Sequence, residues 1–357
     1  MSIFDQKVIK YEMKPLSSLE KVFPDETPVY RMECQMLSGL WGETVSFQVA
    51  YTGDFVMRER LDVRVVSELA EHVHVRTVEM VPVGRATNGI VDDNYLKTIS
   101  GLYPDLLKDL KDGKVIVYSR QWRSLWVDVD ITNEIPAGEY EIELQLIKEG
   151  EVVCSAKQKV TVIGTELPKL DIMHTEWMHA DCLADYYHVE VFSEEHWKLL
   201  ENYFQEYVKR DCNMMLTPLF TSPLDTAIGL ERTTCQLIDV EVKDGEYVFG
   251  FEKLKRWIDL CKKCGIEYFE MSHLFSQWGA KYAPKVVATV NGKKEKIFGW
   301  HTPAVGEYTK FLESFLPQLT AKLREWKIAD VTYFHISDEP REEHLESYPV
   351  MNFTVTV

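Results

Sequence analysis

The sequence lacks any apolar run long enough to cross a membrane. No stretch approaches the roughly 18 consecutive apolar residues that a transmembrane helix needs. Its first ten residues, MSIFDQKVIK, contain neither an apolar segment nor the small-residue cleavage site of a secretory signal peptide. We therefore expect no membrane association.

Basic residues are also scarce. The chain has 40 Lys and Arg against 57 Asp and Glu, for a net charge of −17. Because no basic excess is available to neutralise phosphates, we predict that the protein does not bind nucleic acid or anionic membranes. Solubility is the simplest explanation of so acidic a composition.

Cysteine and the common cofactor motifs are sparse. The seven cysteines are scattered and odd in number, which favours reduced thiols and a cytoplasmic location. Cys261 and Cys264 have redox or zinc spacing, but no second Cys or His pair follows them. The chain also has no GxGxxG, P-loop, HExxH or GxSxG motif. We predict no metal and no cofactor.

The first part of the chain is rich in strand patterns. With 357 residues the chain can form two domains. The segment Ile135–Tyr140 is similar to the tyrosine-corner entry of immunoglobulin-like sandwiches, and Ser100–Leu107 is interpreted as a loop with apolar anchors. We predict a β-sandwich domain over residues 1–165. The strands expected in it are Val29–Met36, Thr44–Tyr51, Leu61–Val66, Val73–Val81, Lys114–Tyr118, Ser124–Ile131, Glu139–Ile147 and Val152–Val162.

After a linker at Gly164–Pro168 the pattern changes to alternating strands and helices. We predict an α/β domain over residues 166–357 that resembles a (β/α)₈ barrel but contains only about four β/α units. A whole barrel takes about 250 residues, so the chain is interpreted as a truncated version of a longer protein; the alternative is a smaller open sheet. The expected strands are Leu170–His174, Asn213–Leu216, Ile266–Met271 and Val331–Ile336, and the expected helices are Ser193–Lys209, Phe251–Lys263 and Pro303–Trp326. Two hairpins are expected between them, over Cys235–Phe251 and Thr289–Ile297.

Two adjacent acids follow the last of these strands. Asp338 and Glu339 come directly after an apolar run and before Pro340, which cannot continue a sheet ladder. In α/β folds, catalytic side chains lie at the carboxyl ends of strands. A pair of carboxylates suits glycoside hydrolysis, in which one acid protonates the leaving oxygen and the other stabilises the positive charge that develops on the sugar. A solvated strand end is the structural alternative.

The other predicted strand ends carry residue types that bind sugars. Aromatic rings offer apolar faces to the C–H side of a sugar, and His and Asp hydrogen-bond its hydroxyls. For any single residue, core packing or loop stabilisation is the more common explanation, and only their shared position at one predicted face favours sugar binding by the group. The candidates are Trp177, His179, Asp181 and Tyr186 after the first strand, His273 and Trp278 after the third, and Trp300 and His301 further on.

The order of these motifs resembles glycoside hydrolase family 123. The resemblance covers roughly Thr44 to Tyr348 and is carried by WMHADCLADYY from Trp177, by His273 with QWG from Gln277, and by HISDEP from His335. It implies a β-N-acetylgalactosaminidase with a β-sandwich ahead of a (β/α)₈ barrel. By the same resemblance Glu339 is the general acid/base, and Asp338 orients the 2-acetamido group of the substrate, which acts as the nucleophile.

The resemblance implies a glycan with terminal β-linked N-acetylgalactosamine as the substrate and the eight candidates above as its contacts. A non-catalytic glycan-binding or subunit-association fragment is the alternative function, because members of the family continue through four more β/α units. We also expect that a homo-oligomer covers the incomplete barrel.

Overall fold

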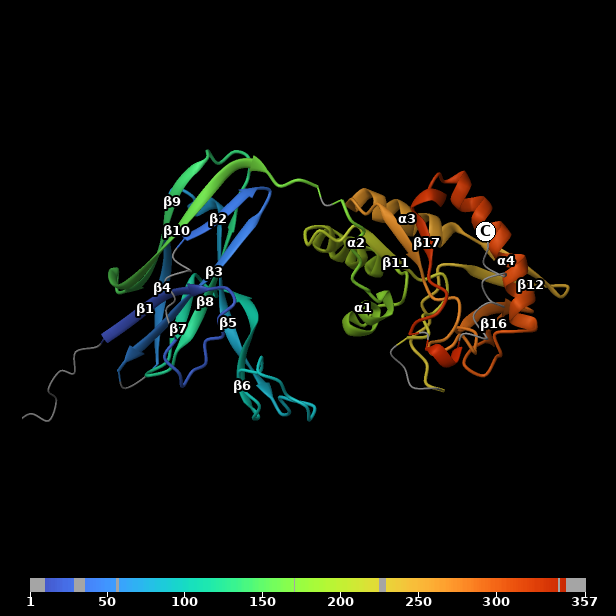
Figure 1. The fold of residues 1–357 in the computed structure, drawn as a ribbon, viewed down its shortest axis with the longest axis horizontal. Coiled ribbons are helices and arrows are strands. Elements are labelled where there is room, and N and C mark those ends of the chain that lie inside the picture. The colour runs from blue at the N-terminus through green and yellow to red at the C-terminus, as the bar shows by residue number, and fades with distance from the viewer. Residues whose placement is uncertain are drawn as a thin grey trace, which may run out of the picture. The chain divides into compact units, whose positions relative to one another are not determined.

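The computed structural model describes residues 10–28, 36–55, 58–169, 171–224, 229–339 and 341–344. The chain divides into two compact units, Met1–Lys169 and Leu170–Val357 (Figure 1). No helix in the described ranges is both long and apolar enough to cross a membrane.

The first unit consists of strands, as predicted, in two five-stranded sheets. One sheet has the order β1 (Lys10–Ser17), β3 (Thr44–Asp54), β8 (Arg123–Asp130), β5 (Val73–Val83), β6 (Gly101–Asp109). The other has the order β2 (Met36–Trp41), β10 (Glu151–Glu166), β9 (Gly138–Lys148), β4 (Glu59–Val66), β7 (Lys114–Val117). A 3₁₀ turn, Ala70–His72, precedes β5.

Alternating side chains of the two sheets form one apolar core. Leu125 and Val127 of β8 and Leu144 and Leu146 of β9 are fully buried in the same cluster. Period-two alternation directs every second side chain of a strand to the same face, so each sheet contributes one apolar face. Two layers that share a core are the basic arrangement of a sandwich.

The segment Ile135–Tyr140 makes the hydrogen bond that its sequence suggests. The hydroxyl of Tyr140 donates to the carbonyl oxygen of Pro136 at 2.8 Å, four residues upstream. This backward bond from a Tyr to the preceding backbone is the defining feature of a tyrosine corner. It fixes the approach of the chain to β9.

The prediction of a loop over Ser100–Leu107 is wrong. These residues belong to β6, which pairs antiparallel with β5, and the register shifts between Val78 and Met80 opposite Pro104. Proline lacks an N–H, so it is tolerated in a sheet at an edge or a bulge, and β6 is the edge strand here. This strand could not be recognised from the sequence, because Pro104 is unfavourable in a central strand of a sheet and tolerated only at an edge or a bulge.

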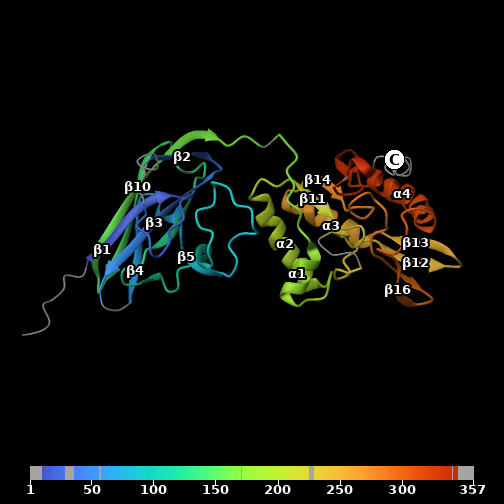
Figure 2. The same cartoon turned by 60° about the horizontal axis from the view of Figure 1, so that its bottom comes forward.

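The second unit contains a three-stranded parallel sheet of β11 (Met214–Thr217), β14 (Tyr268–Met271) and β17 (Thr332–Phe334). Its helices are α1 (Ala180–Tyr187), α2 (Glu194–Val208), α3 (Glu252–Cys264) and α4 (Glu307–Glu325), with 3₁₀ turns at Ala329–Val331 and Glu342–His344. Figure 2 shows β11 beside β14. Parallel strands separated by helices are the unit from which (β/α) barrels are built, and the described residues form such a partial sheet.

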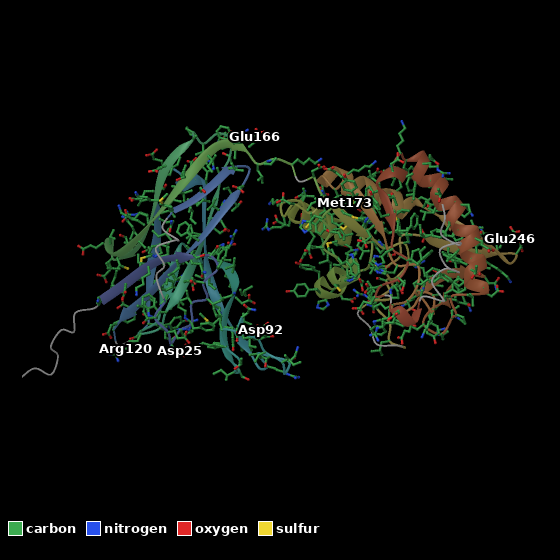
Figure 3. The ribbon with its side chains drawn as sticks, in the orientation of Figure 1. Asp25, Asp92, Arg120, Glu166, Met173 and Glu246 are labelled. Atoms are coloured by element: carbon green, nitrogen blue, oxygen red, sulfur yellow. The ribbon has the colours of Figure 1, made fainter. Side chains whose placement is uncertain are left out.

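The predicted first strand of this sheet, Leu170–His174, is wrong for the residues that the structure describes. Residues 171–174 have no regular structure, and Met173, labelled in Figure 3, is 49 % exposed. The side-chain carbonyl of Asn213 accepts the backbone N–H of His174 at 2.8 Å. The carbonyl oxygen of His174 also accepts the backbone N–H groups of Asn213 and Met214 at 3.0 and 3.1 Å, so the segment is bonded to the start of β11 without forming a strand.

The two predicted hairpins form and join into one sheet, in the order β13 (Glu246–Gly250), β12 (Asp239–Lys243), β15 (Val286–Val290), β16 (Lys293–Phe298). The parallel pairing of β12 with β15 links them and was not predicted. Glu246, labelled in Figure 3, begins β13. Phe249 of that strand packs on Phe311 and Phe315 of α4, at ring-centroid distances of 5.5 and 5.1 Å.

The predicted helix start at Ser193 is confirmed. Its side chain accepts the backbone N–H of His196 at 3.2 Å, and α2 begins at the next residue. Trp197, Leu200 and Phe204 of this helix are buried in the core of the second unit. Spacings of three and four residues place these side chains on one helix face.

Candidate active site

The carboxyl ends of the three parallel strands lie in register. Thr217 of β11 pairs with Met271 of β14, which pairs with Phe334 of β17. The backbone N–H of His335 donates to the carbonyl oxygen of Met271 at 3.2 Å, which continues this alignment one residue beyond β17. The residues that follow β14 and β17 therefore meet at one edge of the sheet, where α/β proteins place their sites.

The loop after β14 holds both predicted catalytic acids. Nε2 of Gln277 donates to Oδ2 of Asp338 at 2.8 Å, and indole Nε1 of Trp278 donates to Oε2 of Glu339 at 2.6 Å. The backbone N–H of Trp278 also donates to the carbonyl oxygen of Asp338 at 3.1 Å. Two neighbouring residues thus fix two neighbouring carboxylates, and Asp338 is partly buried while Glu339 is exposed.

Both partners of the Trp278–Glu339 bond have left-handed backbone conformations. Their φ angles are 56° for Trp278 and 48° for Glu339. A non-glycine residue in this region costs on the order of 1–3 kcal/mol and is typical of functional sites. The hydrogen bonds between the two loops compensate part of that cost and hold the side chains in place.

Glu270 is a further site residue that sequence reasoning missed. It lies within β14, is 7 % exposed, and accepts hydrogen bonds from Nε1 of Trp177 at 3.1 Å and from Nδ1 of His335 at 2.7 Å. The sequence contained one indication of this, a single carboxylate in the otherwise apolar strand YFEM. A charged side chain in a buried strand is rare unless it has a partner, so Glu270 could have been selected as a candidate.

Hydrogen bonding determines the charge state of Glu270. Burial alone raises the pKa of this carboxyl, but the hydrogen bonds from His335 and Trp177 and the nearby imidazoles lower it by more. The net pKa lies below its usual value, so Glu270 is an anion at neutral pH. An anionic carboxylate only accepts hydrogen bonds, so Nδ1 of His335 is the donor.

His273 lies in the interior of this cluster. Its ring is 3.8 Å from that of His335 by centroids, with the planes tilted by 36°, and it meets the edge of Trp177 at 5.1 Å. The side chain is 1 % exposed, and neither ring nitrogen has a hydrogen-bond partner among the described residues. Burial, and secondarily the neighbouring His335, lower the pKa of His273 to about 4, so it is neutral at pH 7.

The segment with the other four predicted contacts is partly helical rather than a loop. Trp177 precedes α1 and His179 occupies its N-cap position, whereas Asp181 and Tyr186 lie within the helix. Asp181 is buried and pairs with Arg232, with Nε of Arg232 2.8 Å from Oδ2, which gives it a structural partner. Tyr186 is 76 % exposed and packs on Tyr187.

The last two predicted contacts follow β16. The ring of Trp300 packs against Tyr282 at 6.4 Å, and His301 is exposed. Among the described residues, neither side chain hydrogen-bonds to Asp338 or Glu339. Of the eight predicted contacts, Trp278 hydrogen-bonds to Glu339 and His273 has a ring nitrogen within 4.8 Å of a carboxylate oxygen of Asp338. Trp177 contacts His273 and His335 and bonds to Glu270 rather than to either acid.

Comparison with known proteins identifies the family of the chain and a solved structure with a similar fold. A family model described as the glycoside hydrolase 123 catalytic domain matches residues 177–355. The structure of a family 123 glycoside hydrolase from Clostridium perfringens, described in terms of glycolipid glycan hydrolysis, is similar with a TM-score of 0.70 and 14 % identity. The match covers 98 % of this chain and 61 % of that one, so the chain spans less than two thirds of the length of this relative.

Other solved structures match only a part of the chain. The macrocyclisation enzyme AvmM of alchivemycin A biosynthesis has a TM-score of 0.24 at 11 % identity, covering 46 % of this chain and 93 % of its own. A β-glucosidase from Listeria innocua in complex with isofagomine has a TM-score of 0.21 at 10 % identity, covering 45 % and 17 %. No curated protein matches the sequence. The catalytic-domain match extends over half of the chain, and the chain therefore belongs to glycoside hydrolase family 123.

Proposed function

We propose that the chain is a glycosidase that removes terminal β-linked N-acetylgalactosamine with retention of configuration, using the acetamido group of the substrate as nucleophile. The observation that carries this proposal is the fixed pair Asp338 and Glu339 in the segment after β17, each held by one residue of the loop after β14. The choice of N-acetylgalactosamine rests on the family resemblance.

Glu339 is the general acid and base in this scheme. It is exposed, and only Oε2 is engaged by Trp278, so the other carboxyl oxygen is available to the leaving oxygen of the glycosidic bond. The proton passes from Glu339 to the leaving oxygen as the bond to the anomeric carbon breaks. The resulting carboxylate then removes a proton from the water that attacks the same carbon.

Asp338 positions the internal nucleophile. Gln277 holds its Oδ2, and the other oxygen makes no hydrogen bond to the described residues. That oxygen accepts the N–H of the acetamido group, which increases electron density on the amide carbonyl. The carbonyl oxygen attacks the anomeric carbon and forms a bicyclic oxazolinium ion. Water opens this ion from the opposite face, so two inversions give net retention.

The indoles supply the sugar-binding surface in this proposal. Trp177 and Trp278 are 38 % and 40 % exposed, which is high for tryptophan rings anchored by hydrogen bonds from their own Nε1 groups. Their nitrogens are fixed by Glu270 and Glu339, and the exposed ring surface can accept the C–H side of a sugar. We retain His179, which is partly buried, as a contact to sugar hydroxyls, whereas His273 is 1 % exposed and is not proposed as a direct contact.

An assay on two substrates tests the proposal. We expect the chain to release p-nitrophenol from the β-N-acetylgalactosaminide in preference to the β-N-acetylglucosaminide. Removing the acid/base with Glu339→Gln is expected to lower kcat by about 10²–10⁴-fold, and Asp338→Asn by a similar factor. Glu342→Gln, a nearby exposed acid, is the matched control and should retain full activity. Equal rates for the wild type and both site variants would contradict the proposal.

Glycan binding without turnover is the second candidate, favoured by the 61 % coverage of the structural relative. It predicts that calorimetry detects binding of a glycan with terminal β-linked N-acetylgalactosamine while no product forms. A thiazoline analogue of the bicyclic intermediate separates the two functions, since an enzyme binds such an analogue far more tightly than its substrate. Equal affinity for analogue and substrate would favour the binding function.

A further inference from the structure

Three side chains at the strand ends form a cluster that the proposed hydrolysis does not fully use. His273 follows β14, and His335 and Asp338 follow β17. One potential ligand atom from each, a ring nitrogen or a carboxylate oxygen, lies within 4.8 Å of the others. Two imidazoles and one carboxylate are a donor set that first-row transition metals prefer.

The unpartnered ring of His273 is an independent indication of a ligand. The side chain is 1 % exposed, and both of its nitrogens lack a hydrogen-bond partner among the described residues. A buried polar group left without a partner lowers stability, because it has lost its hydrogen bonds to water. A bound ion would convert this cost into a stabilising interaction, because a neutral imidazole offers one nitrogen as a ligand.

His335 already has the outer partner that metal-bound histidines commonly have. Its Nδ1 donates to Oε1 of Glu270 at 2.7 Å. This bond leaves the other ring nitrogen, Nε2, with a free electron pair, and the carboxylate makes that nitrogen a stronger donor to a metal. Glu270 is itself held in place, because its other carboxylate oxygen accepts the hydrogen bond from Trp177. It therefore fixes the orientation of the His335 ring.

We propose that His273, His335 and Asp338 bind one divalent transition-metal ion, with Zn²⁺ the preferred choice. Nitrogen ligands disfavour Mg²⁺ and Ca²⁺, which select oxygen. The close ring centroids, 3.8 Å apart, must separate somewhat for both imidazoles to coordinate one ion, so we expect weaker binding than at a structural zinc site. Three ligands leave a coordination position open to water.

Metal binding would oppose hydrolysis, and this part of the inference rests on the proposed function. An ion bound to Asp338 withdraws that carboxylate from the acetamido group and places a positive charge beside a carbon that becomes cationic. We therefore expect Zn²⁺ to compete with the glycan. It should raise the apparent KM and leave kcat unchanged.

Calorimetry on the metal-free full chain tests the site without any need for activity. We expect one Zn²⁺ per chain and no saturable binding of Mg²⁺. His335→Ala and Asp338→Asn should each weaken Zn²⁺ binding at least tenfold, and Glu270→Gln about 10–100-fold. His188→Asn is the matched control, because His188 is exposed and asparagine accepts its left-handed backbone, with φ 55°. Circular dichroism confirms that each variant is folded.

The possible results separate the two proposals. No saturable Zn²⁺ binding by the wild type, or equal binding by His335→Ala and Asp338→Asn, would overturn the metal site. Zn²⁺ binding by a chain that hydrolyses no glycoside would uphold the metal site and contradict the enzyme. If the apparent KM for the glycoside is the same with and without a Zn²⁺ concentration that saturates the site, the proposed competition between Zn²⁺ and the glycan is wrong.

Discussion

The two units bury polar side chains for different purposes. In the described residues of the first unit, the buried polar side chains are Gln48, Ser124 and Gln158, and none is ionisable. Nε2 of Gln48 donates to the carbonyl oxygen of Glu20 at 2.7 Å, and Ser124 donates to Oε1 of Gln48 at 2.9 Å. These bonds connect neighbouring parts of the backbone and serve the fold.

In the described residues of the second unit, the buried side chains include Asp181 of α1, His196 of α2, Glu270 of β14 and His273, which follows β14. Glu270 bonds to Trp177 and His335, which belong to the site rather than to the scaffold, and His273 has no partner in the described chain. Burying such groups lowers stability unless something compensates them. The described residues of the second unit therefore bury carboxylate and imidazole groups at this edge of the sheet, whereas those of the first unit bury only amides and a hydroxyl among the side chains named above.

The largest expected effect concerns the core of the first unit. Leu144→Ala removes a fully buried side chain between the two sheets and should lower the free energy of unfolding by about 2–5 kcal/mol. Urea unfolding measures this change. Ile116→Ala on β7 is the control. Ile116 is 39 % exposed, so this substitution should lower the free energy of unfolding much less. Equal losses at the two positions would show that Leu144 is not packed as described.

The next effect concerns pH and arises in the second unit. The folded-state pKa of His273 is about 4, below the ordinary 6.5, so the unfolded chain takes up the proton first as the pH falls. Its contribution to stability is complete above pH 6.5 and is lost between pH 6.5 and 4, on the order of 3 kcal/mol.

Urea unfolding at pH 7 and pH 4.5 checks this prediction. His273→Leu should show a smaller loss of stability over this interval than the wild type. Distant groups such as His196, whose pKa burial also lowers, contribute equally to both proteins, so the difference reports His273 together with the groups that it interacts with, Glu270 among them. If the wild type and His273→Leu show the same pH dependence of stability, protonation of the His273 ring does not destabilise the folded protein, and the prediction is wrong.

A smaller effect tests the hydrogen bond by which Gln277 holds Asp338. Gln277→Ala removes the donor to Oδ2 of Asp338, a hydrogen bond to a charged group worth about 1.5–3 kcal/mol. If that bond positions Asp338 for the transition state, kcat measured well below the melting temperature should fall by roughly 10–100-fold, whereas the melting temperature should fall by only several degrees. A change confined to stability would assign Gln277 to the scaffold instead.

The sequence predicts those parts of the fold that depend on local pattern. Period-two alternation located most strands of the first unit, and Ser193 located the start of α2. These features need only the preferences of neighbouring residues. The strand before the acid pair was expected over Val331–Ile336, but β17 covers Thr332–Phe334, so the acids lie in the segment after the strand rather than directly at its end.

Features that depend on distant pairing could not be predicted in this way. The parallel contact of β12 with β15 joins hairpins that each look independent, and β6 is a strand because β5 supplies a partner. Likewise, nothing near Glu270 in the sequence indicates that Trp177 and His335 will donate hydrogen bonds to its carboxylate. Buried charges become interpretable only when their partners are known.

Chemical rescue of Glu339→Gln by azide tests the central claim most directly. With an activated p-nitrophenyl leaving group, the variant can still form the oxazolinium ion but lacks the base that activates water. Azide needs no base, so the account predicts that it restores turnover and yields the β-glycosyl azide, whereas Asp338→Asn is not rescued. Failure of azide to raise the rate of Glu339→Gln, or equal rescue of both variants, would contradict the roles assigned to the two acids.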